Sequence, residues 1–354
     1  MIFFRIDMIL KAMVIALVLS GIALGQTKNF IPVEGANLKA KFDSAIVAGK
    51  ANAPQGRFWV GYQFEARPGV AIDFEVVDSA GGVYMSIDGT SMIFDSSHET
   101  RELGLFLLFD EQRNQFIRAE VYNLRREREF SSYPVYWAGR IGNEESLNYL
   151  KSIIDSPATE LNRLSERAVF AIALHDDARV DPMLIEMIRR PIAEPMRSRA
   201  IYWLGHTPET QTKNTLFTEL VRNNQESGEV RQQAMSAFAM SRSAGTLPLF
   251  QNLFETITSW ELRRRALTGI ARNDNSDAAA TYLIRVAETD NDLELQKQAV
   301  IAIGKLSKDK AVPILIRTAR NHPKMAVRKV AIQVLGHTKD ERAVAFFTEL
   351  LSKD

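Results

Sequence analysis

Apolar and small residues recur at a fixed spacing through the C-terminal two-thirds of the chain. The repeated unit is an alanine, an apolar residue, two variable residues, a second apolar residue and a glycine or alanine; at 299–304 it reads AVIAIG. Copies lie at 168–173, 200–205, 234–239, 266–271, 299–304 and 331–336, with a weaker copy, WAGRIG, at 137–142. Their first residues are 31, 32, 34, 32, 33 and 32 positions apart. Self-similarity at this period predicts a helical solenoid.

The polar turns between the copies divide this region into antiparallel helix pairs. First helices are expected at 144–155, 181–190, 209–222, 246–257, 276–288 and 309–319, and second helices at 160–174, 194–205, 228–240, 260–271, 293–305 and 324–336. A helix at 134–142 should precede the first pair, and one at 340–352 should close the stack. The alanine that opens each copy, here called the motif alanine, should let neighbouring helices approach closely. Three residues before it, four of the six copies carry an arginine, which we expect to hold repeats in register: Arg197, Arg231, Arg263 and Arg328.

Nearer the N-terminus the hydrophobic period changes from that of a helix to two. Apolar residues alternate with polar ones at 58–65, 72–76, 83–87 and 117–121, while 103–109 is apolar on both faces and suits a central strand. A further possible strand lies around 38–42. Turn sequences such as Arg67-Pro68-Gly69 and Asp88-Gly89 separate the runs. This pattern predicts a small antiparallel β-sandwich or barrel.

The expected fold class is therefore mixed and mainly α. A cleaved signal peptide at 1–25 precedes a β-rich domain at 26–124, a charged connector at 125–133 and a helical array at 134–354. The signal is predicted from the uncharged run at 12–24, which follows Arg5 and Lys11 and ends in the small residues of 23–25. The alternative, an uncleaved anchor, stays open at this point.

The pattern of an apolar residue, arginine, motif alanine and glycine, with a proline in the preceding helix, resembles the HEAT-like repeats of the armadillo superfamily. The order of signal, β-rich segment and array is also similar to exported bacterial HEAT-repeat proteins of unassigned function. Because such arrays mostly serve as interaction surfaces, the resemblance implies a non-catalytic scaffold that binds a protein partner. It implies a place in the bacterial cell envelope, in the periplasm or outside the cell.

The amino-acid composition excludes several kinds of catalytic, metal-binding and nucleic-acid-binding site. The chain has no cysteine, which removes thiolate nucleophiles, disulfides and cysteine-type zinc sites. Loss of residues 1–25 would leave 42 basic against 42 acidic residues, so we expect no bulk attraction for nucleic acid and no stable membrane insertion after cleavage. Asp290, Asp292 and Glu294 alternate as in a calcium loop without its glycine, and are expected to form a turn and a helix cap. No metal site, cofactor or catalytic residue is predicted.

The candidate partner- or domain-docking residues lie two positions before or after the motif alanine, where a second helix should face outward. They are aromatic in the first two pairs and basic in the last three: Phe170, Tyr202, Arg264, Lys297 and Lys329. The two aromatic residues could instead pack against the β-rich domain. Two other functions stay open: a glycan-binding or hydrolytic β-rich module carried on the array, and, less in keeping with export and neutral charge, a glycosylase of DNA.

Overall fold

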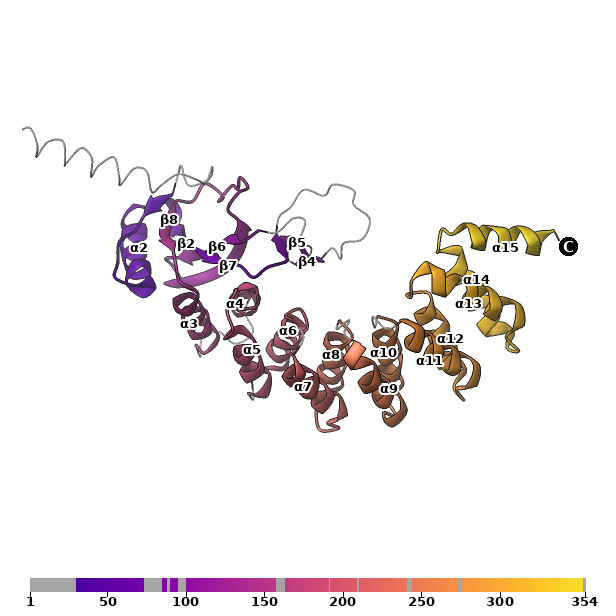
Figure 1. The fold of residues 1–354 in the computed structure, drawn as a ribbon. Helices are drawn as coiled ribbons and strands as arrows, with labels where there is room; N and C mark the ends of the chain where they lie inside the picture. The colour runs from indigo at the N-terminus through magenta and orange to yellow at the C-terminus, as the bar shows by residue number, and fades with distance from the viewer. Residues whose placement is uncertain are drawn as a thin grey trace, which may run out of the picture. The chain divides into compact units, whose positions relative to one another are not determined.

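The computed structural model describes residues 30–72, 85–87, 90–94, 100–156, 163–190, 192–208, 210–240, 244–272 and 276–352. The expected signal peptide lies outside the described residues. The chain forms two compact units, 1–180 and 181–354. The first helix pair therefore lies in the same unit as the sheet (Figure 1).

Unit 1 is built on a five-stranded mixed sheet (Figure 1). Its strands lie in the order β1 (Ile31–Pro32), β8 (Val135–Arg140), β2 (Arg57–Glu65), β6 (Glu102–Asp110) and β7 (Gln115–Asn123). β8 runs parallel to both β1 and β2, and the other two pairings are antiparallel. A second, three-stranded sheet has the order β3 (Val70–Ile72), β5 (Thr90–Phe94) and β4 (Met85–Ile87). The mixed, mainly helical fold is confirmed, but the parallel pairings replace the purely antiparallel sandwich or barrel that was expected.

The segment at 134–142 was expected to be a helix, and this prediction was wrong. It forms strand β8, which pairs Val135, Tyr136 and Trp137 with β2. β-Branched and aromatic side chains at these positions favour a strand. Gly139 has a φ of +78° beside the register shift in the β2–β8 ladder, a conformation that glycine adopts without steric cost. The copy at 137–142 thus matched the repeat in spacing alone.

The possible strand at 38–42 was also predicted wrongly, since this segment begins helix α2 (Leu38–Asn52). The Asn37 side chain caps the helix by accepting a hydrogen bond from the Ala40 backbone N–H at 2.8 Å. One face of α2 buries Leu38, Phe42, Ala45 and Gly49 at helical spacing. Two of these four residues are alanine and glycine, so the apolar stripe is weak and the sequence did not display it.

Helices α3 (Asn143–Ile154) and α4 (Arg163–Leu174) complete unit 1. α3 contacts α2 and β2, while α4 contacts α3 and β7. The sheet side of this packing is apolar: Phe58, Val60, Tyr62 and Phe64 of β2 are all fully buried. A buried ion pair joins Arg167 of α4 to Glu120 of β7 at 3.5 Å.

The expected connector at 125–133 is largely exposed, but two of its aromatic residues are half-buried. Phe130 and Tyr133 pack against an apolar cluster on the sheet that contains Trp59 and Phe106. The Trp59 indole N–H donates to the Phe130 carbonyl at 3.3 Å. The segment is therefore fastened to the sheet on its way into β8.

Unit 2 consists of helices stacked in pairs (Figure 1). The first helices are α5 (Val180–Arg189), α7 (Gln211–Arg222), α9 (Leu247–Thr256), α11 (Ser276–Thr289) and α13 (Lys308–Asn321). The second helices are α6 (Glu194–Leu204), α8 (Gly228–Phe238), α10 (Trp260–Ala271), α12 (Leu293–Ile303) and α14 (Met325–Gly336), and α15 (Glu341–Leu351) follows. These bounds confirm the predicted helices to within about three residues. In the described part of the chain, no helix is long and apolar enough to cross a bilayer.

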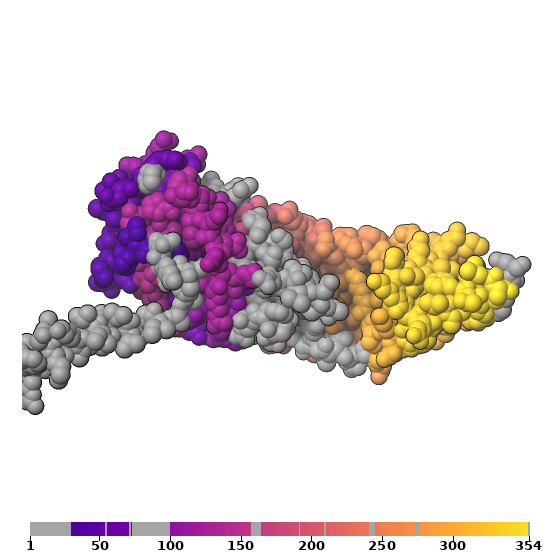
Figure 2. Space-filling model, turned by 90° about the horizontal axis from the view of Figure 1, so that it is seen from above, coloured from indigo at the N-terminus to yellow at the C-terminus, as the bar shows by residue number. Residues whose placement is uncertain are grey.

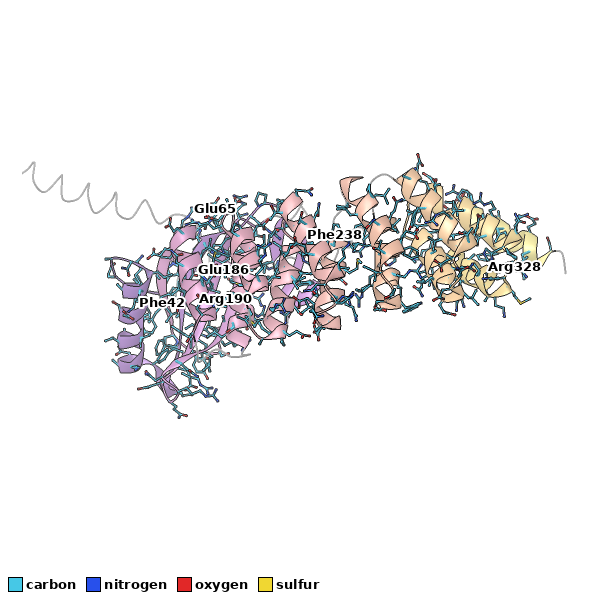
Figure 3. The ribbon with its side chains drawn as sticks, turned by 90° about the horizontal axis from the view of Figure 1, so that it is seen from below. Phe42, Glu65, Glu186, Arg190, Phe238 and Arg328 are labelled. Carbon is cyan, nitrogen blue, oxygen red and sulfur yellow. The ribbon has the colours of Figure 1, made fainter. Side chains whose placement is uncertain are left out.

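The motif alanines are buried in the helical array. All six are at most 1% exposed, and the apolar residues four positions before and after them are also buried, as Phe238 of α8 illustrates (Figure 3). Successive second helices pack against one another far more extensively than successive first helices do. The second helices therefore form the close-packed layer of unit 2, and the small alanine side chain permits that approach.

The repeated arginines are structural: each of the four joins the two helices of its own pair, and two of them also reach the next pair, as expected of residues that hold repeats in register. Each donates to a backbone carbonyl at or just beyond the end of the preceding first helix: Arg197 to Ile188, Arg231 to Val221, Arg263 to Phe254 and Arg328 to His322. A cation at a helix C-terminus satisfies carbonyls that lack a helical partner. Arg197 also binds Glu226 through two hydrogen bonds of 2.9 and 2.6 Å, and Arg263 binds Asp290 at 2.8 Å. Arg328 occupies the corresponding position in the last pair (Figure 3).

Enlarging a motif alanine should overpack a helix crossing. For Ala299→Leu we expect a loss of roughly 1–3 kcal/mol in the free energy of unfolding, because Ala299 is completely buried. Urea unfolding followed by circular dichroism measures the change. The control is Ala51→Leu, since Ala51 is an exposed alanine in helix α2. Equal stability of the two variants would contradict the assigned register.

Candidate functional site

The predicted docking residues do not share one environment. Phe170 lies on α4, the helix that contacts β7, and is 2% exposed, which agrees with the expectation that it packs within the β-rich part of the chain rather than facing an open partner site. Tyr202 on α6 is half-buried. Arg264 and Lys297 are half-buried on α10 and α12, and Lys329 is exposed on α14. The accessible members of the set are therefore those of unit 2, and the basic ones lie on three consecutive second helices.

A third position extends the pattern. Relative to the motif alanine, residues at −2, +2 and +6 follow one another at intervals of four along each second helix and so lie on one side of it. We call these positions the second-helix stripe. Its members, from α6 to α14, are Ser198, Tyr202, His206; Gln232, Ser236, Met240; Arg264, Thr268, Arg272; Lys297, Ile301, Lys305; and Lys329, Gln333, His337. All of them are half-buried or exposed.

The +6 position adds basic residues that the sequence reasoning missed. Arg272 and Lys305 occupy it on α10 and α12, and both are exposed. They lie at the ends of their helices, outside the repeated unit that was used to align the copies. Reading the alignment one residue past the motif glycine or alanine would have found them. Helices α10 and α12 thus carry a basic residue at both ends of the stripe, and α14 carries Lys329 at one end and His337 at the other.

Carboxylates balance part of this charge. Glu261 binds Arg264 through hydrogen bonds of 3.0 and 2.6 Å, and both oxygens of Glu294 accept from Lys297 at 2.8 Å. Within the described ranges, Arg272, Lys305 and Lys329 form no ion pair. The position that precedes Lys329 by one turn is Ala326, so α14 lacks the carboxylate that α10 and α12 have there. The net charge of the stripe is accordingly positive over α10, α12 and α14.

Neighbouring second helices are linked along the stripe. Arg265 of α10 donates to Ser236 at 2.6 Å and to Gln232 at 3.1 Å, both on α8. Lys305 lies 3.4 Å from the Thr268 hydroxyl of α10. Partial burial lowers the pKa of Lys305, and the positive charges of Arg272 and Arg264 lower it further. Cations held close enough to oppose one another's charge would be stabilised by an anionic group brought among them.

Unit 1 contains a different polar cluster, which joins Tyr62 of β2, Ser146 of α3 and His175. The Tyr62 hydroxyl lies 2.7 Å from Ser146 Oγ, which lies 2.8 Å from His175 Nε2. His175 Nδ1 lies 2.7 Å from the Ala171 carbonyl oxygen. The three side chains are at most 2% exposed, so the cluster belongs to the core rather than to a cleft.

The direction of these hydrogen bonds follows from their partners. A carbonyl oxygen can only accept, so the imidazole proton lies on Nδ1 and Nε2 accepts from Ser146. Ser146 then accepts from the Tyr62 hydroxyl. The imidazole ring also stacks on Phe64, with 4.2 Å between ring centroids. Burial lowers the pKa of His175 to about 4, so the ring is neutral at physiological pH. The cluster joins the sheet to both helices of the first pair.

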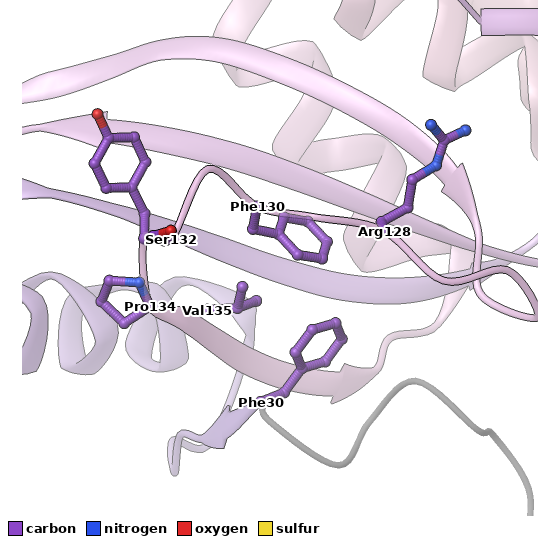
Figure 4. A pocket seen from close by; sticks show the side chains of 7 residues that line it. Phe30, Arg128, Phe130, Ser132, Pro134 and Val135 are labelled. Carbon is purple, nitrogen blue, oxygen red and sulfur yellow. The ribbon is translucent and has the colours of Figure 1, made fainter.

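An aromatic cleft of about 220 Å³ lies on unit 1 beside the start of β8. Its walls come from Phe30, Arg128, Phe130 and residues 132–135 (Figure 4). Ligand pockets usually hold about 300–1,000 Å³, so this cleft is small for a ligand. Phe30 also makes edge and tilted contacts with Phe106, Phe130 and Trp137, which makes the cleft a seam in an aromatic cluster.

The acidic residues at 290–294 form the expected turn and cap. Asp292 accepts hydrogen bonds from the backbone N–H groups of Glu294 and Leu295 at the start of α12. Asp290 accepts from the Asp292 N–H and from Arg263. In the part of the chain that the structure describes, no three metal-ligating side chains converge.

Comparison with known proteins supports the repeat assignment. Residues 280–354 match the family model of HEAT repeats. No curated protein matches the chain. Among solved structures, the complex of CpcE and CpcF of phycocyanin lyase from Nostoc sp. PCC7120 matches with 17% sequence identity and a TM-score of 0.32. That match covers 58% of this chain and 81% of the other.

Acid should destabilise unit 1 through His175. The unfolded chain binds a proton on this residue near pH 6.5 and the folded chain only near pH 4. Lowering the pH through this window therefore favours unfolding, and by pH 4 we expect a loss of about 3 kcal/mol. Urea unfolding at pH 7.5 and at pH 4 measures this loss. His175→Gln cannot titrate here, so a wild-type pH dependence as shallow as that of the variant would contradict the assignment.

Proposed function

We propose that the protein is a non-catalytic scaffold that binds a protein partner through the second-helix stripe of unit 2. This proposal rests on one observation: α10 and α12 each carry basic residues at both the −2 and the +6 position, and α14 carries Lys329 at the −2 position. Three of these side chains have no ion pair among the described residues. The partner segment with matching chemistry is acidic.

The position of the charges supports a specific contact rather than general adhesion. The whole sequence carries a net charge of only +1, so attraction for acidic molecules is local to the stripe. Complementary charge across an interface mainly speeds encounter and selects the partner. Ile301 lies between Lys297 and Lys305 and is 37% exposed, which offers an apolar contact at the centre of the basic rows. An acidic segment with an apolar side chain among its carboxylates would fit this arrangement.

A charge-reversal pair tests the binding face. Lys305→Glu with Lys329→Glu should weaken binding of a labelled glutamate-rich peptide by about tenfold or more, because each change replaces attraction with repulsion. The matched control is Lys308→Glu with Arg317→Glu, which makes the same change of charge at exposed positions of α13. Fluorescence anisotropy measures the affinity.

For the wild type, raising the salt concentration should also weaken binding, because exposed charges are screened. Equal loss in the two double variants would mean that binding follows the net charge alone. Unchanged binding in the first variant would place the peptide elsewhere.

We also propose that the protein is exported to the bacterial envelope or beyond, on the basis of the apolar run at 12–24. Mass spectrometry of the protein from its native envelope fraction should find an N-terminus at Gln26 or close by. Recovery from the cytosol of a chain that begins at Met1 or Met8 would contradict export.

A further inference from the structure

A row of exposed apolar residues borders the second-helix stripe at its N-terminal end. Trp260 of α10, Leu293 of α12 and Met325 of α14 all lie six residues before the motif alanine. Their exposed fractions are 40%, 36% and 61%, although the three helices belong to the close-packed layer of unit 2. We call these three residues the apolar row. Exposed apolar side chains that gather on neighbouring elements mark binding surfaces.

The apolar row occurs on the same helices that carry the basic residues. At the equivalent position α6 has Glu194 and α8 has Gly228, so neither helix continues the row. Those two helices also lack a basic residue at the −2 position, where they have Ser198 and Gln232. α10 and α12 each have second helices packed on both sides, so the exposure of the first two members of the row arises within the array. Apolar and basic residues therefore enter the stripe together, from α10 onward.

The −6 and −2 positions are one turn apart on the same side of each helix, so the apolar row lies next to the first basic residues. In α10 this contact is direct, because the Arg264 guanidinium lies 6.0 Å from the centre of the Trp260 ring. The carboxylates that follow the row on α10 and α12 are held in ion pairs with the −2 cations. α10, α12 and α14 follow one another from orange to yellow in Figure 2. A ligand on this side therefore contacts apolar side chains in one row and cations in the rows beside it.

The spacing of the row fits a helix better than an extended chain. Neighbouring packed helices lie about 8–10 Å apart, so the members of the row are spaced at about this interval. Seven residues of an α-helix rise about 10.5 Å and bring the chain back to nearly the same face. In a β-strand, side chains on one face lie about 6.7 Å apart, which does not match the interval. A helix with an apolar residue at one position of each heptad can contact Trp260, Leu293 and Met325 in turn.

We propose that the acidic partner segment is an amphipathic helix that crosses α10, α12 and α14. Its apolar stripe lies on the apolar row, and its carboxylates lie beside the basic positions of the second-helix stripe. This inference rests on the proposed function and names the kind of segment that the stripe binds. Binding of an amphipathic helix by its apolar face is a recurring mode of peptide recognition. Trp260 supplies the aromatic contact that often dominates such an interface.

Two labelled peptides of the same composition test the proposal on the wild-type protein. Both are helical, rich in glutamate and three heptads long. One has a leucine at the same position of each heptad, and the other has its leucines on different faces. Fluorescence anisotropy should show that the first peptide binds about tenfold more tightly or better, because only its leucines can all reach the apolar row. Equal affinities would overturn the proposal.

Removal of the row should abolish this preference. Trp260→Gln with Leu293→Gln should weaken binding of the first peptide to the level of the second, and Met325→Gln should reduce the preference in part. The matched control is Val47→Gln with Val344→Gln, which removes side chains that are 71% and 62% exposed on α2 and α15. Circular dichroism checks that each variant folds. A preference that persists without the row would place the leucines elsewhere and contradict the proposal.

Failure of this inference is distinguishable from failure of the proposed function. A glutamate-rich peptide without leucine should bind if the stripe attracts acidic segments, whether or not the row contributes. Equal binding of all three peptides would contradict the helix alone, whereas loss of all binding would contradict both proposals. Sedimentation with vesicles of phosphatidylcholine and phosphatidylglycerol tests a membrane surface. Vesicle binding that Trp260→Gln with Leu293→Gln abolishes, without a preference between the peptides, would overturn the helix in favour of lipid.

Discussion

The close approach of the second helices depends on one small side chain in each repeat. The motif alanines have almost no exposed surface, and apolar residues four positions to either side close the layer around them. Since each alanine lies 32 to 34 residues from the next within 168–336, one packing solution repeats along the array. The arginine three residues before the alanine, present in four repeats, joins the two helices of a pair, because it donates to backbone carbonyls at the end of the preceding first helix. Together they leave the −2, +2 and +6 positions facing away from the packed layer.

Unit 1 uses a helix pair of the same kind to cover part of a sheet. The end of β2 is joined to the segment after α4 by backbone hydrogen bonds, from Arg67 to Leu174 and from Asp176 to Glu65. Arg101 adds ion pairs to Glu65 and Asp176, and the buried chain of Tyr62, Ser146 and His175 crosses the same region. Figure 3 marks Glu65, which accepts from both Arg101 and Arg140. The first pair is thereby anchored to the sheet through its loops as well as its apolar face.

The helices of the array could be predicted from the sequence because the same pattern of alanine and apolar residues recurs in every pair, and that pattern is set by the packing of each helix against its neighbours. The helix bounds, the buried motif alanines and the role of the arginines all follow from position within the repeat. Predictions failed where a single local signal was weak or ambiguous. The segment at 137–142 fits the repeat spacing, but its pairing with β2 depends on residues about 75 positions away. Helix α2 has a stripe with alanine and glycine, and its burial depends on Phe58 and Tyr62, which the local sequence cannot show.

In the candidate site, too, some features could be predicted from the repeat and others could not. The −2 and +2 positions could be read from the repeat. Whether each basic residue is neutralised depends on the residue one turn before it, which is a glutamate before Arg264 and Lys297 but an alanine before Lys329. Position in the repeat left open whether Phe170 faces a partner or packs within unit 1, and the structure buries it on α4, the helix that contacts β7. Repeat phase thus predicts which side of a helix a residue occupies, but only tertiary packing decides whether that side is covered.

Site-specific photo-crosslinking in the native host tests the central claim most directly. A photoreactive amino acid placed at Lys305 or Lys329 should link one partner, and mass spectrometry should locate the link in an acidic segment of that partner. The same amino acid at Arg317 on α13 should link none. Links that form from Arg317 but not from Lys305 or Lys329, or a linked segment without acidic residues, would contradict the assignment of the second-helix stripe as the binding face.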